Sequence, residues 1–254
     1  MPLMILSDYD GTLAPIAATP QQATLSRATR ALLRRLSRVP GIWVGVISGR
    51  SLKDIKRVIG LPRLLYGGNH GLELQGPRMS FCHPKARAAR ARLRRLAARL
   101  QRVLRDVPGA RMEWKGLTIS VHWRAVRRSA QPLFHQLVAR ELQEPRRRGR
   151  IRVTRGKRVV EIHPPVDWGK GEAVRWLWRY LPVPREAPRP WVIYLGDDQT
   201  DEEAFHMTNR LGGISILVGA PRQQTAATYR LKSPRHVHRW LTALSHVWRE
   251  HALQ

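Results

Sequence analysis

The feature that most constrains the fold is an alternation between short, uncharged apolar runs and longer segments with helical periodicity. The apolar runs are rich in branched residues and are bounded by Gly, Pro or Asp, which is typical of strands buried on both faces of a sheet. Strands that alternate with helices predict a parallel, doubly wound α/β sheet. The predicted strands are Leu3–Leu6, Ile42–Ile47, Leu64–Tyr66, Trp191–Leu195 and Ile214–Val218, and the predicted helices are 25–36, 52–59, 172–180, 201–208 and 236–250.

The middle of the chain departs from this alternation, because a helix followed by two strands occurs there twice. The predicted helices are 84–104 and 131–142, and the predicted strands are 111–114, 117–123, 151–154 and 159–162. We therefore predict a doubly wound parallel-sheet core, residues 1–76 and 166–254, into which a smaller α+β domain, residues 77–165, is inserted. Gly76 and Pro164-Pro165 suit the linkers at its two ends.

The chain is strongly basic, with a formal net charge of +28. The segment 79–167 has 23 basic and 6 acidic residues, and its stretch 85–105 has nine Lys or Arg and no acid. Such a run can bind nucleic acid through its phosphates, but it lacks the interleaved aromatic residues of single-strand binders. We interpret it as a solvated helix face whose potential also attracts anionic substrates, and we expect no functional nucleic-acid contact.

The cysteine content and the apolar runs bear on the compartment. Cys82 is the only cysteine, so an intrachain disulfide is impossible, which fits a reducing compartment. The apolar run 3–6 is too short for a signal sequence. The longest uncharged apolar stretches fall far below the roughly 20 residues that span a bilayer. We expect a cytoplasmic monomer without membrane contact.

Two carboxylates follow the first predicted strand in the motif Asp8-Tyr9-Asp10-Gly11-Thr12. The carboxyl ends of the strands are where doubly wound sheets bind ligands. The two carboxylates of such a pair can have different roles, one as nucleophile and metal ligand and the other as general acid and base. The alternative is that Asp8 and Asp10 only cap the following turn.

A second acidic cluster follows the predicted strand 191–195 and contains five of the 18 acids. Hard oxygen ligands from two strand ends suit Mg²⁺. Stabilisation of a helix N-terminus is the alternative, and it explains Asp201 to Glu203 better than Asp197. The cluster comprises Asp197, Asp198, Asp201, Glu202 and Glu203.

Two further motifs suit phosphate binding. Ser48-Gly49-Arg50 ends the second predicted strand, where a hydroxyl and a helix N-terminus can hold a phosphate oxygen. Gly169-Lys170-Gly171 brings an ammonium group to the core between two flexible residues. Taken singly, each motif is weak.

In this order, the four motifs resemble those of the haloacid dehalogenase-like phosphatases. The resemblance implies a doubly wound core and a Mg²⁺-assisted mechanism through an aspartyl-phosphate. Asp8 is then the nucleophile, Asp10 the general acid and base, and Ser48 and Lys170 the phosphate ligands. The metal candidates that it implies, together with the acidic cluster, are Asp8, Asp10, Asp197, Asp198 and Asp201.

Further motifs over nearly the whole chain resemble the trehalose-6-phosphate phosphatase family. They are Gly68-Asn69-His70-Gly71, Glu113-Trp114-Lys115, Val121-His122-Trp123-Arg124, Gly156-Lys157-Arg158-Val159-Val160-Glu161 and Asp201-Glu202-Glu203-Ala204-Phe205. The resemblance implies that the inserted domain is a cap that recognises the sugar. Glu113, Lys115 and Glu161 would then bind glucose hydroxyls, and Arg124 and Lys157 would help to hold the phosphate side. The other implied substrate contacts are Arg50, Asn69 and His70, of which His70 equally suits a structural hydrogen bond.

The function implied is Mg²⁺-dependent hydrolysis of trehalose 6-phosphate to trehalose and phosphate. Another sugar phosphatase, acting on sucrose 6-phosphate or a mannosyl phosphate, is the nearest alternative. A nucleic-acid-binding protein on a degenerate phosphatase scaffold is a more distant one. The presence of Asp8, Asp10, Ser48, Lys170 and Asp197 argues against degeneracy.

Overall fold

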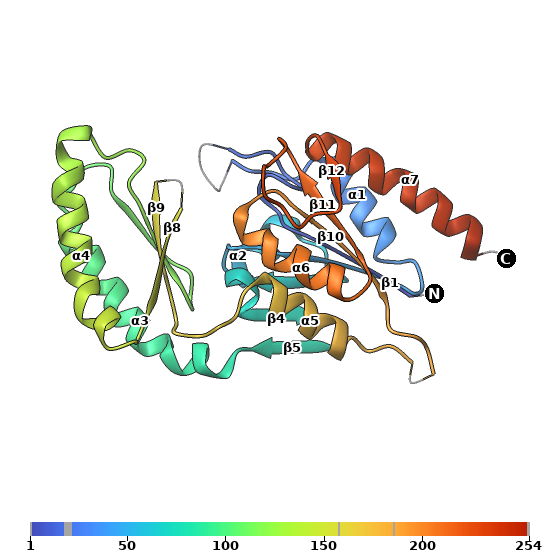
Figure 1. Ribbon diagram of the computed structural model, residues 1–254, viewed down its shortest axis with the longest axis horizontal. Helices are drawn as coiled ribbons and strands as arrows, with labels where there is room; N and C mark the ends of the chain where they lie inside the picture. Colours follow the sequence, from blue (N-terminus) through green and yellow to red (C-terminus); the bar gives the residue numbers. More distant parts are fainter. Residues whose placement is uncertain (1, 18–21, 157, 185, 253–254) are drawn as a thin grey trace. The chain divides into compact units, whose positions relative to one another are not determined.

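The first strand, β1 (Leu3–Ser7), lies in the middle of an eight-stranded sheet (Figure 1). The computed structural model describes residues 2–17, 22–156, 158–184 and 186–252. The strand order is β12-β11-β10-β1-β2-β3-β4-β5. The strands from β12 to β3 run parallel, and β4 is antiparallel to β3. The other strands are β2 (Ile42–Ile47), β3 (Leu65–Gly68), β4 (Glu73–Gly76), β5 (Met79–Cys82), β10 (Trp191–Gly196), β11 (Ile214–Val218) and β12 (Tyr229–Leu231).

Helices cover both faces of this sheet, as the strand periodicity requires. Leu3 and Ile5 of β1 pack in one buried cluster with α1, α2 and α7, whereas Met4 and Leu6 pack in another with α5 and α6. Successive residues of a strand point to opposite faces, so a strand apolar throughout must be covered twice. The helices are α1 (Arg27–Leu36), α2 (Leu52–Ile59), α5 (Lys170–Tyr180), α6 (Glu202–Arg210) and α7 (Pro234–Ala252). The predicted doubly wound α/β core is confirmed.

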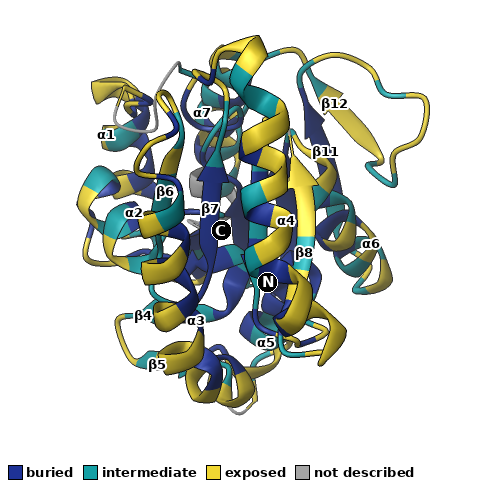
Figure 2. Cartoon of the chain, turned by 90° about the vertical axis from the view of Figure 1, so that its left-hand side faces the viewer, coloured by how far each residue is buried: buried dark blue, intermediate teal, exposed yellow. Residues whose placement is uncertain are grey.

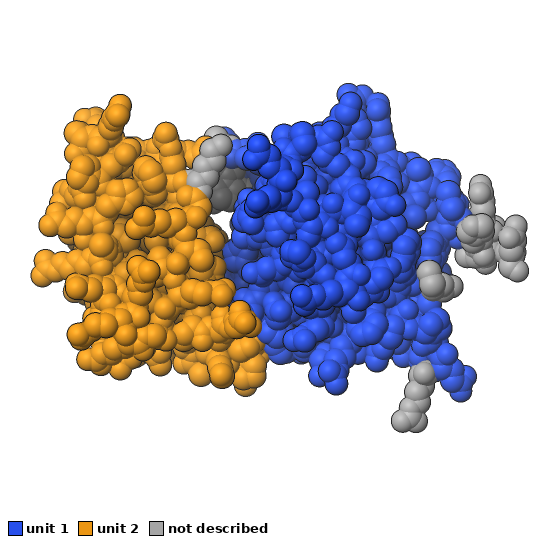
Figure 3. Space-filling view, viewed as in Figure 1, with its two compact units in different colours: residues 1–81, 168–254 blue, residues 82–167 orange. Residues whose placement is uncertain are grey.

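A second, antiparallel sheet of order β6-β7-β9-β8 belongs to the insertion. The chain divides into a core unit, residues 1–81 and 168–254, and an inserted unit, residues 82–167 (Figure 3). The sequence predicts 77–165 for the insertion. The division falls later because Met79–Cys82 forms the edge strand β5 of the core sheet. The inserted elements are α3 (Pro84–Val103), β6 (Arg111–Trp114), β7 (Ile119–His122), α4 (Gln131–Arg147), β8 (Arg152–Gly156) and β9 (Val159–His163).

The two faces of the inserted sheet differ in chemistry. Ile119 and Val121 of β7, which is dark blue in Figure 2, pack with the buried faces of α3 and α4. α4 itself shows buried and exposed stripes in Figure 2, as an amphipathic helix should. The other face carries a row in register across the sheet, with Glu113 beside Ser120, Ser120 beside Glu161 and Glu161 beside Thr154.

Three strands of the core sheet, β4, β5 and β12, are absent from the sequence prediction. Each spans only three or four residues, and most of those residues are partly or fully exposed. They lack the uncharged apolar runs that mark the interior strands. No helix in the described part of the chain combines the length and apolar character needed to cross a membrane.

Candidate active site

Asp8 occupies the topological switch point of the core sheet. From β1 the sheet grows through β2 and β3 on one side and through β10 and β11 on the other. Ligands of doubly wound sheets bind where the strand order reverses, beyond the carboxyl ends of the strands. The backbone N–H of Asp8 donates to the Leu195 carbonyl of β10 at 2.8 Å, which fixes the residue between the two strand ends.

Lys170 joins two buried carboxylates. Its Nζ lies 2.7 Å from Asp8 Oδ1 and 2.8 Å from Asp201 Oδ1. The residue is the first of α5, and Gly171 beside it allows α5 to approach α6, because a Cβ there would lie 2.6 Å from the Glu203 carbonyl oxygen. Burial opposes the ammonium charge, but Asp201 and Asp8 outweigh it and raise the pKa of Lys170.

Asp201 is the most completely bonded of the site carboxylates. Its Oδ1 accepts from the Tyr194 hydroxyl at 2.8 Å as well as from Lys170. Its Oδ2 accepts the backbone N–H groups of Asp197 at 3.1 Å and of Asp198 at 2.9 Å. Asp201 therefore holds the loop after β10 through these backbone bonds, and its negative charge orients the Lys170 ammonium.

Three carboxylates offer oxygens within 4.8 Å of one another, namely Asp8, Asp197 and Asp201. Burial raises the pKa of Asp8 well above its ordinary value and that of Asp197 to about 7. Lys170 can balance only one of the three carboxylate charges, and unbalanced buried charge is unfavourable. Its donors are the hard oxygens that Mg²⁺ prefers, so the residues present fit a divalent metal.

Gly11 makes room for this arrangement. Its φ is +90°, in the left-handed region that favours glycine, and a Cβ there would collide with the Asp197 carboxylate. Thr12 donates its hydroxyl to Asp197 Oδ1 at 3.2 Å. The Asp-Gly-Thr turn after β1 therefore contacts the acidic loop after β10 directly.

Asp10 is held by Arg50 rather than by the carboxylate cluster. Nε and Nη2 of Arg50 donate to the two Asp10 oxygens at 2.8 and 2.6 Å, and Nη1 donates to Asp54 Oδ2 at 3.2 Å. The buried guanidinium also lies 4.9 Å from the centre of the Tyr9 ring. Two carboxylates and an aromatic face thus fix Arg50, and its bidentate bond fixes Asp10.

Ser48, Asn69 and His70 lie together beyond β2 and β3. Ser48 is buried, and its hydroxyl accepts the Arg50 N–H at 3.2 Å. The backbone N–H groups of Asn69 and His70 donate to the Arg50 and Ser48 carbonyls at 2.7 and 2.9 Å. Asn69 is fully buried, and its side chain donates to Glu73 at 3.0 Å. These bonds join the ends of β2 and β3 and hold Ser48 at the carboxyl end of β2, the strand that pairs with β1.

Three predicted sugar-binding side chains gather on the polar face of the inserted sheet. Glu161 Oε1 accepts from the Ser120 hydroxyl at 3.0 Å and lies 3.5 Å from Lys115 Nζ. Glu113 Oε2 lies 3.5 Å from His122 Nε2, and this neighbour lowers the pKa of Glu113. The face thus presents carboxylates, a hydroxyl and an ammonium, groups that exchange hydrogen bonds with sugar hydroxyls.

Of the three remaining predicted residues, two are exposed and one lies outside the described residues. Arg124 is exposed in the turn after β7. The side chain of Asp198 is 69% exposed, and it accepts from the Gln199 N–H at 2.7 Å. Asp198 is therefore not among the three gathered carboxylates. Lys157 lies outside the described residues.

Four residues at these sites escaped the sequence prediction of functional positions, namely Tyr194, Thr12, Asp54 and Ser120. Tyr194 and Ser120 are internal strand residues, and the strand pattern alone does not distinguish them from packing positions. Asp54 is the N3 residue of α2, where an acid normally stabilises the helix. A usable signal existed only for Thr12, which completes the motif that begins at Asp8.

Comparison with known proteins identifies one family. Residues 6–235 match the family model described as trehalose-phosphatase. The chain is 37% identical over 238 residues to a trehalose-phosphate phosphatase of Mycobacterium ulcerans, covering 92% of this chain and 59% of that protein. It is 31% identical over 262 residues to a probable trehalose-phosphate phosphatase D of Arabidopsis thaliana, covering 99% and 69%. The chain thus spans about three fifths of the length of the Mycobacterium relative.

A solved structure shares the fold. The C-terminal domain of a C. albicans trehalose-6-phosphate phosphatase superposes with a TM-score of 0.79 and 24% sequence identity. The superposition covers 97% of this chain and 93% of that one. A doubly wound core with an inserted antiparallel sheet is therefore an architecture found in solved proteins.

Proposed function

The chain belongs to the trehalose-phosphatase family, and we propose that it hydrolyses trehalose 6-phosphate to trehalose and inorganic phosphate with Mg²⁺ as cofactor. The observation that carries the proposal is the contact of Lys170 with both Asp8 and Asp201 at the switch point of the core sheet. A phosphate ester and a carboxylate nucleophile repel each other, so a positively charged group must lie beside them to offset that repulsion. The names of the related proteins supply the substrate.

Asp8 is the nucleophile of the proposed mechanism. One of its oxygens attacks phosphorus in line, the bond from phosphorus to the sugar oxygen breaks, and the phosphoryl group is transferred to Asp8. Lys170 is bonded to Oδ1, which holds the carboxylate in one orientation and leaves Oδ2 for attack. Mg²⁺ bound by Asp8, Asp197 and Asp201 would supply charge that offsets the repulsion between carboxylate and phosphate.

Asp10 acts as the general acid and then as the general base. It gives a proton to the departing sugar oxygen, and it then takes one from the water that attacks the aspartyl-phosphate and releases phosphate. Both Asp10 oxygens are bonded to Arg50, so Arg50 must release at least one of them when substrate arrives. The side chain of Arg50 then keeps Asp54 as a partner and is available to the phosphate group.

The inserted unit is proposed to act as the cap that recognises the sugar. Glu113, Lys115 and Glu161 are its proposed sugar ligands, and the Ser120 hydroxyl orients Glu161. Arg124 and Lys157 remain proposed phosphate-side ligands, and Asn69 and His70 remain proposed substrate contacts. Asp10 and Asp198 remain proposed contributors to the metal site.

Phosphate release tests the proposal. Trehalose 6-phosphate, sucrose 6-phosphate, glucose 6-phosphate and an aryl phosphate are assayed with Mg²⁺ and with EDTA, using the wild-type chain and Asp8→Asn. We expect Mg²⁺-dependent preference for trehalose 6-phosphate and loss of turnover in Asp8→Asn, with the fold intact by circular dichroism. Preference for sucrose 6-phosphate would overturn the substrate assignment. Near-wild-type activity of Asp8→Asn would overturn the mechanism.

A further inference from the structure

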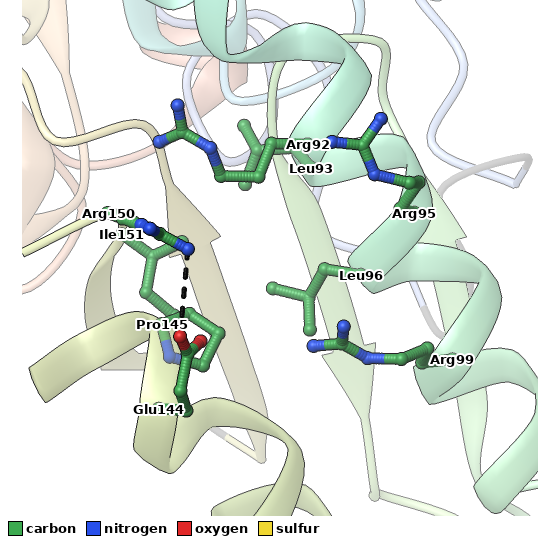
Figure 4. A pocket seen from close by; sticks show the side chains of 9 residues that line it. All are labelled: Arg92, Leu93, Arg95, Leu96, Arg99, Glu144, Pro145, Arg150 and Ile151. Atoms are coloured by element: carbon green, nitrogen blue, oxygen red, sulfur yellow. Dashed lines mark ion pairs between the residues drawn. The ribbon is translucent and has the colours of Figure 1, made fainter. Parts of the chain in front are cut away.

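The inserted unit contains a pocket, between α3 and the C-terminal end of α4, that the proposed hydrolysis does not use (Figure 4). Its volume is about 150 Å³. Sites for drug-sized ligands usually measure about 300–1,000 Å³, so this pocket suits a smaller molecule. Its lining consists of Arg92, Leu93, Arg95, Leu96, Arg99, Glu144, Pro145, Arg150 and Ile151.

The charge of the lining is unbalanced, with four guanidinium groups and one carboxylate. Arg150 lies 3.6 Å from Glu144, and Arg99 lies 2.9 Å from Glu141 just outside the lining. Arg92 and Arg95 form no ion pair with any residue in the described part of the chain. Figure 4 shows all four arginines around the pocket, with Arg99 extending from α3 toward the side where Glu144 lies.

The base of the pocket is formed by core residues of the inserted unit. Leu93 and Leu96 are buried in the core of the inserted unit, and Ile151 is 5% exposed. The arginines of α3 that line the pocket follow one another at intervals of three and four residues, which places them on one face of the helix. An apolar base lined by several arginine side chains differs from a general basic surface, because these forked donors border one small cavity.

We propose that this pocket binds a small inorganic phosphate anion, with Arg92 and Arg95 as its principal ligands. Guanidinium groups form paired, charge-assisted bonds with phosphate oxygens, and the two arginines without a carboxylate partner need give up no ion pair to do so. A nucleic-acid strand fits less well. The lining contains no aromatic side chain on which a base could stack.

Calorimetric titration of the whole chain with pyrophosphate and with orthophosphate tests this site. EDTA is present throughout, so that metal-dependent binding at Asp8 does not contribute. The test variant is Arg92→Gln/Arg95→Gln. The matched control, Arg94→Gln/Arg102→Gln, removes the same charge from exposed positions of α3 outside the pocket. None of the four substituted arginines is buried, so both variants should fold.

We expect saturable binding of pyrophosphate at one site, weakened roughly tenfold in Arg92→Gln/Arg95→Gln by the loss of two charge contacts. The control should change the affinity by less than about twofold. Equal weakening in both variants, or no saturable binding to the wild type, would overturn the proposal. The proposal would also be overturned, in favour of nucleic-acid binding, by a short single-stranded oligonucleotide that displaces pyrophosphate and whose own binding is weakened equally by the two double variants. Failure of the phosphatase assay would leave this result unchanged, because the two sites share no residue.

Discussion

Replacing Lys170 with Met removes the one cation that contacts the buried Asp8 and Asp201 carboxylates in the described site. At an effective dielectric constant of about 20, unit charges 2.7 Å apart attract by about 6 kcal/mol, and the second contact at 2.8 Å is similar. Desolvation of the ammonium offsets much of this attraction. Loss of one member of a buried ion pair costs about 3–5 kcal/mol, and we expect that loss in the free energy of unfolding of the core unit, measured in EDTA.

The assay is urea unfolding followed by tryptophan fluorescence, which reports on both units because Trp114 and Trp123 belong to the inserted one. Compact units can unfold separately, so a second transition from the inserted unit should keep its midpoint. Lys53→Met, at an exposed position, is the matched control and should change stability by less than about 0.5 kcal/mol. Mg²⁺ should stabilise Lys170→Met more than the wild type, because a bound cation replaces the missing charge.

The loss should also depend on pH. Burial raises the pKa of Asp8 in the folded chain, and Lys170 opposes that rise. Without Lys170, the folded-state pKa of Asp8 therefore rises further above its unfolded value. A group with a raised folded-state pKa loses its stabilising contribution as pH increases through that value, so the variant should be less destabilised at pH 5 than at pH 8. A change below about 1 kcal/mol at pH 8 would refute a net stabilising role for Lys170.

Three further substitutions test other parts of the molecule. Asp54→Asn removes a charged partner of Arg50 and should lower kcat/KM for trehalose 6-phosphate roughly fivefold, while the midpoint of urea unfolding changes little. An unchanged kcat/KM would show that Asp54 does not position Arg50. Gly11→Ala places a side chain at φ +90° and against the Asp197 carboxylate, so it should destabilise the core unit by more than about 1 kcal/mol and reduce the stabilisation by Mg²⁺. Calorimetric unfolding with and without Mg²⁺ measures both effects, and wild-type values for both would contradict the close contact between Gly11 and Asp197. Phe134→Ala empties a fully buried position and should cost the inserted unit about 3–5 kcal/mol in urea unfolding, and a loss below about 1 kcal/mol would contradict the packing described for α4.

Interior strands were predictable from the sequence, whereas edge strands were not. The run at Ile42–Ile47 is buried along most of its length in the structure, and a strand covered on both faces must be apolar throughout. β12 at Tyr229–Leu231 has two exposed residues out of three, so no pattern distinguishes it from a loop. The inserted unit begins later than the predicted residue 77 for the same reason, because Met79–Cys82 joins the core sheet without an apolar run.

The sequence predicted where several candidate residues lie on the strands and helices of the core, but it did not predict their contacts. The motifs placed Asp8 at a strand end and Lys170 at a helix start, and both positions are seen in the structure. Nothing local to Asp10 indicates that Arg50 holds both of its oxygens. Nothing in the strand pattern of β7 indicates that Ser120 donates to Glu161.

The sequence by itself determined the alternation of strands and helices, the order of the motifs and the family, because periodicity and side-chain chemistry are properties of neighbouring residues. Only the tertiary structure decided which charges meet. Lys170 and Asp8 are 162 positions apart, and they come together because α5 begins at the carboxyl end of the sheet where β1 stops. The same long-range packing leaves Arg92 and Arg95 at the edge of a pocket instead of beside a carboxylate.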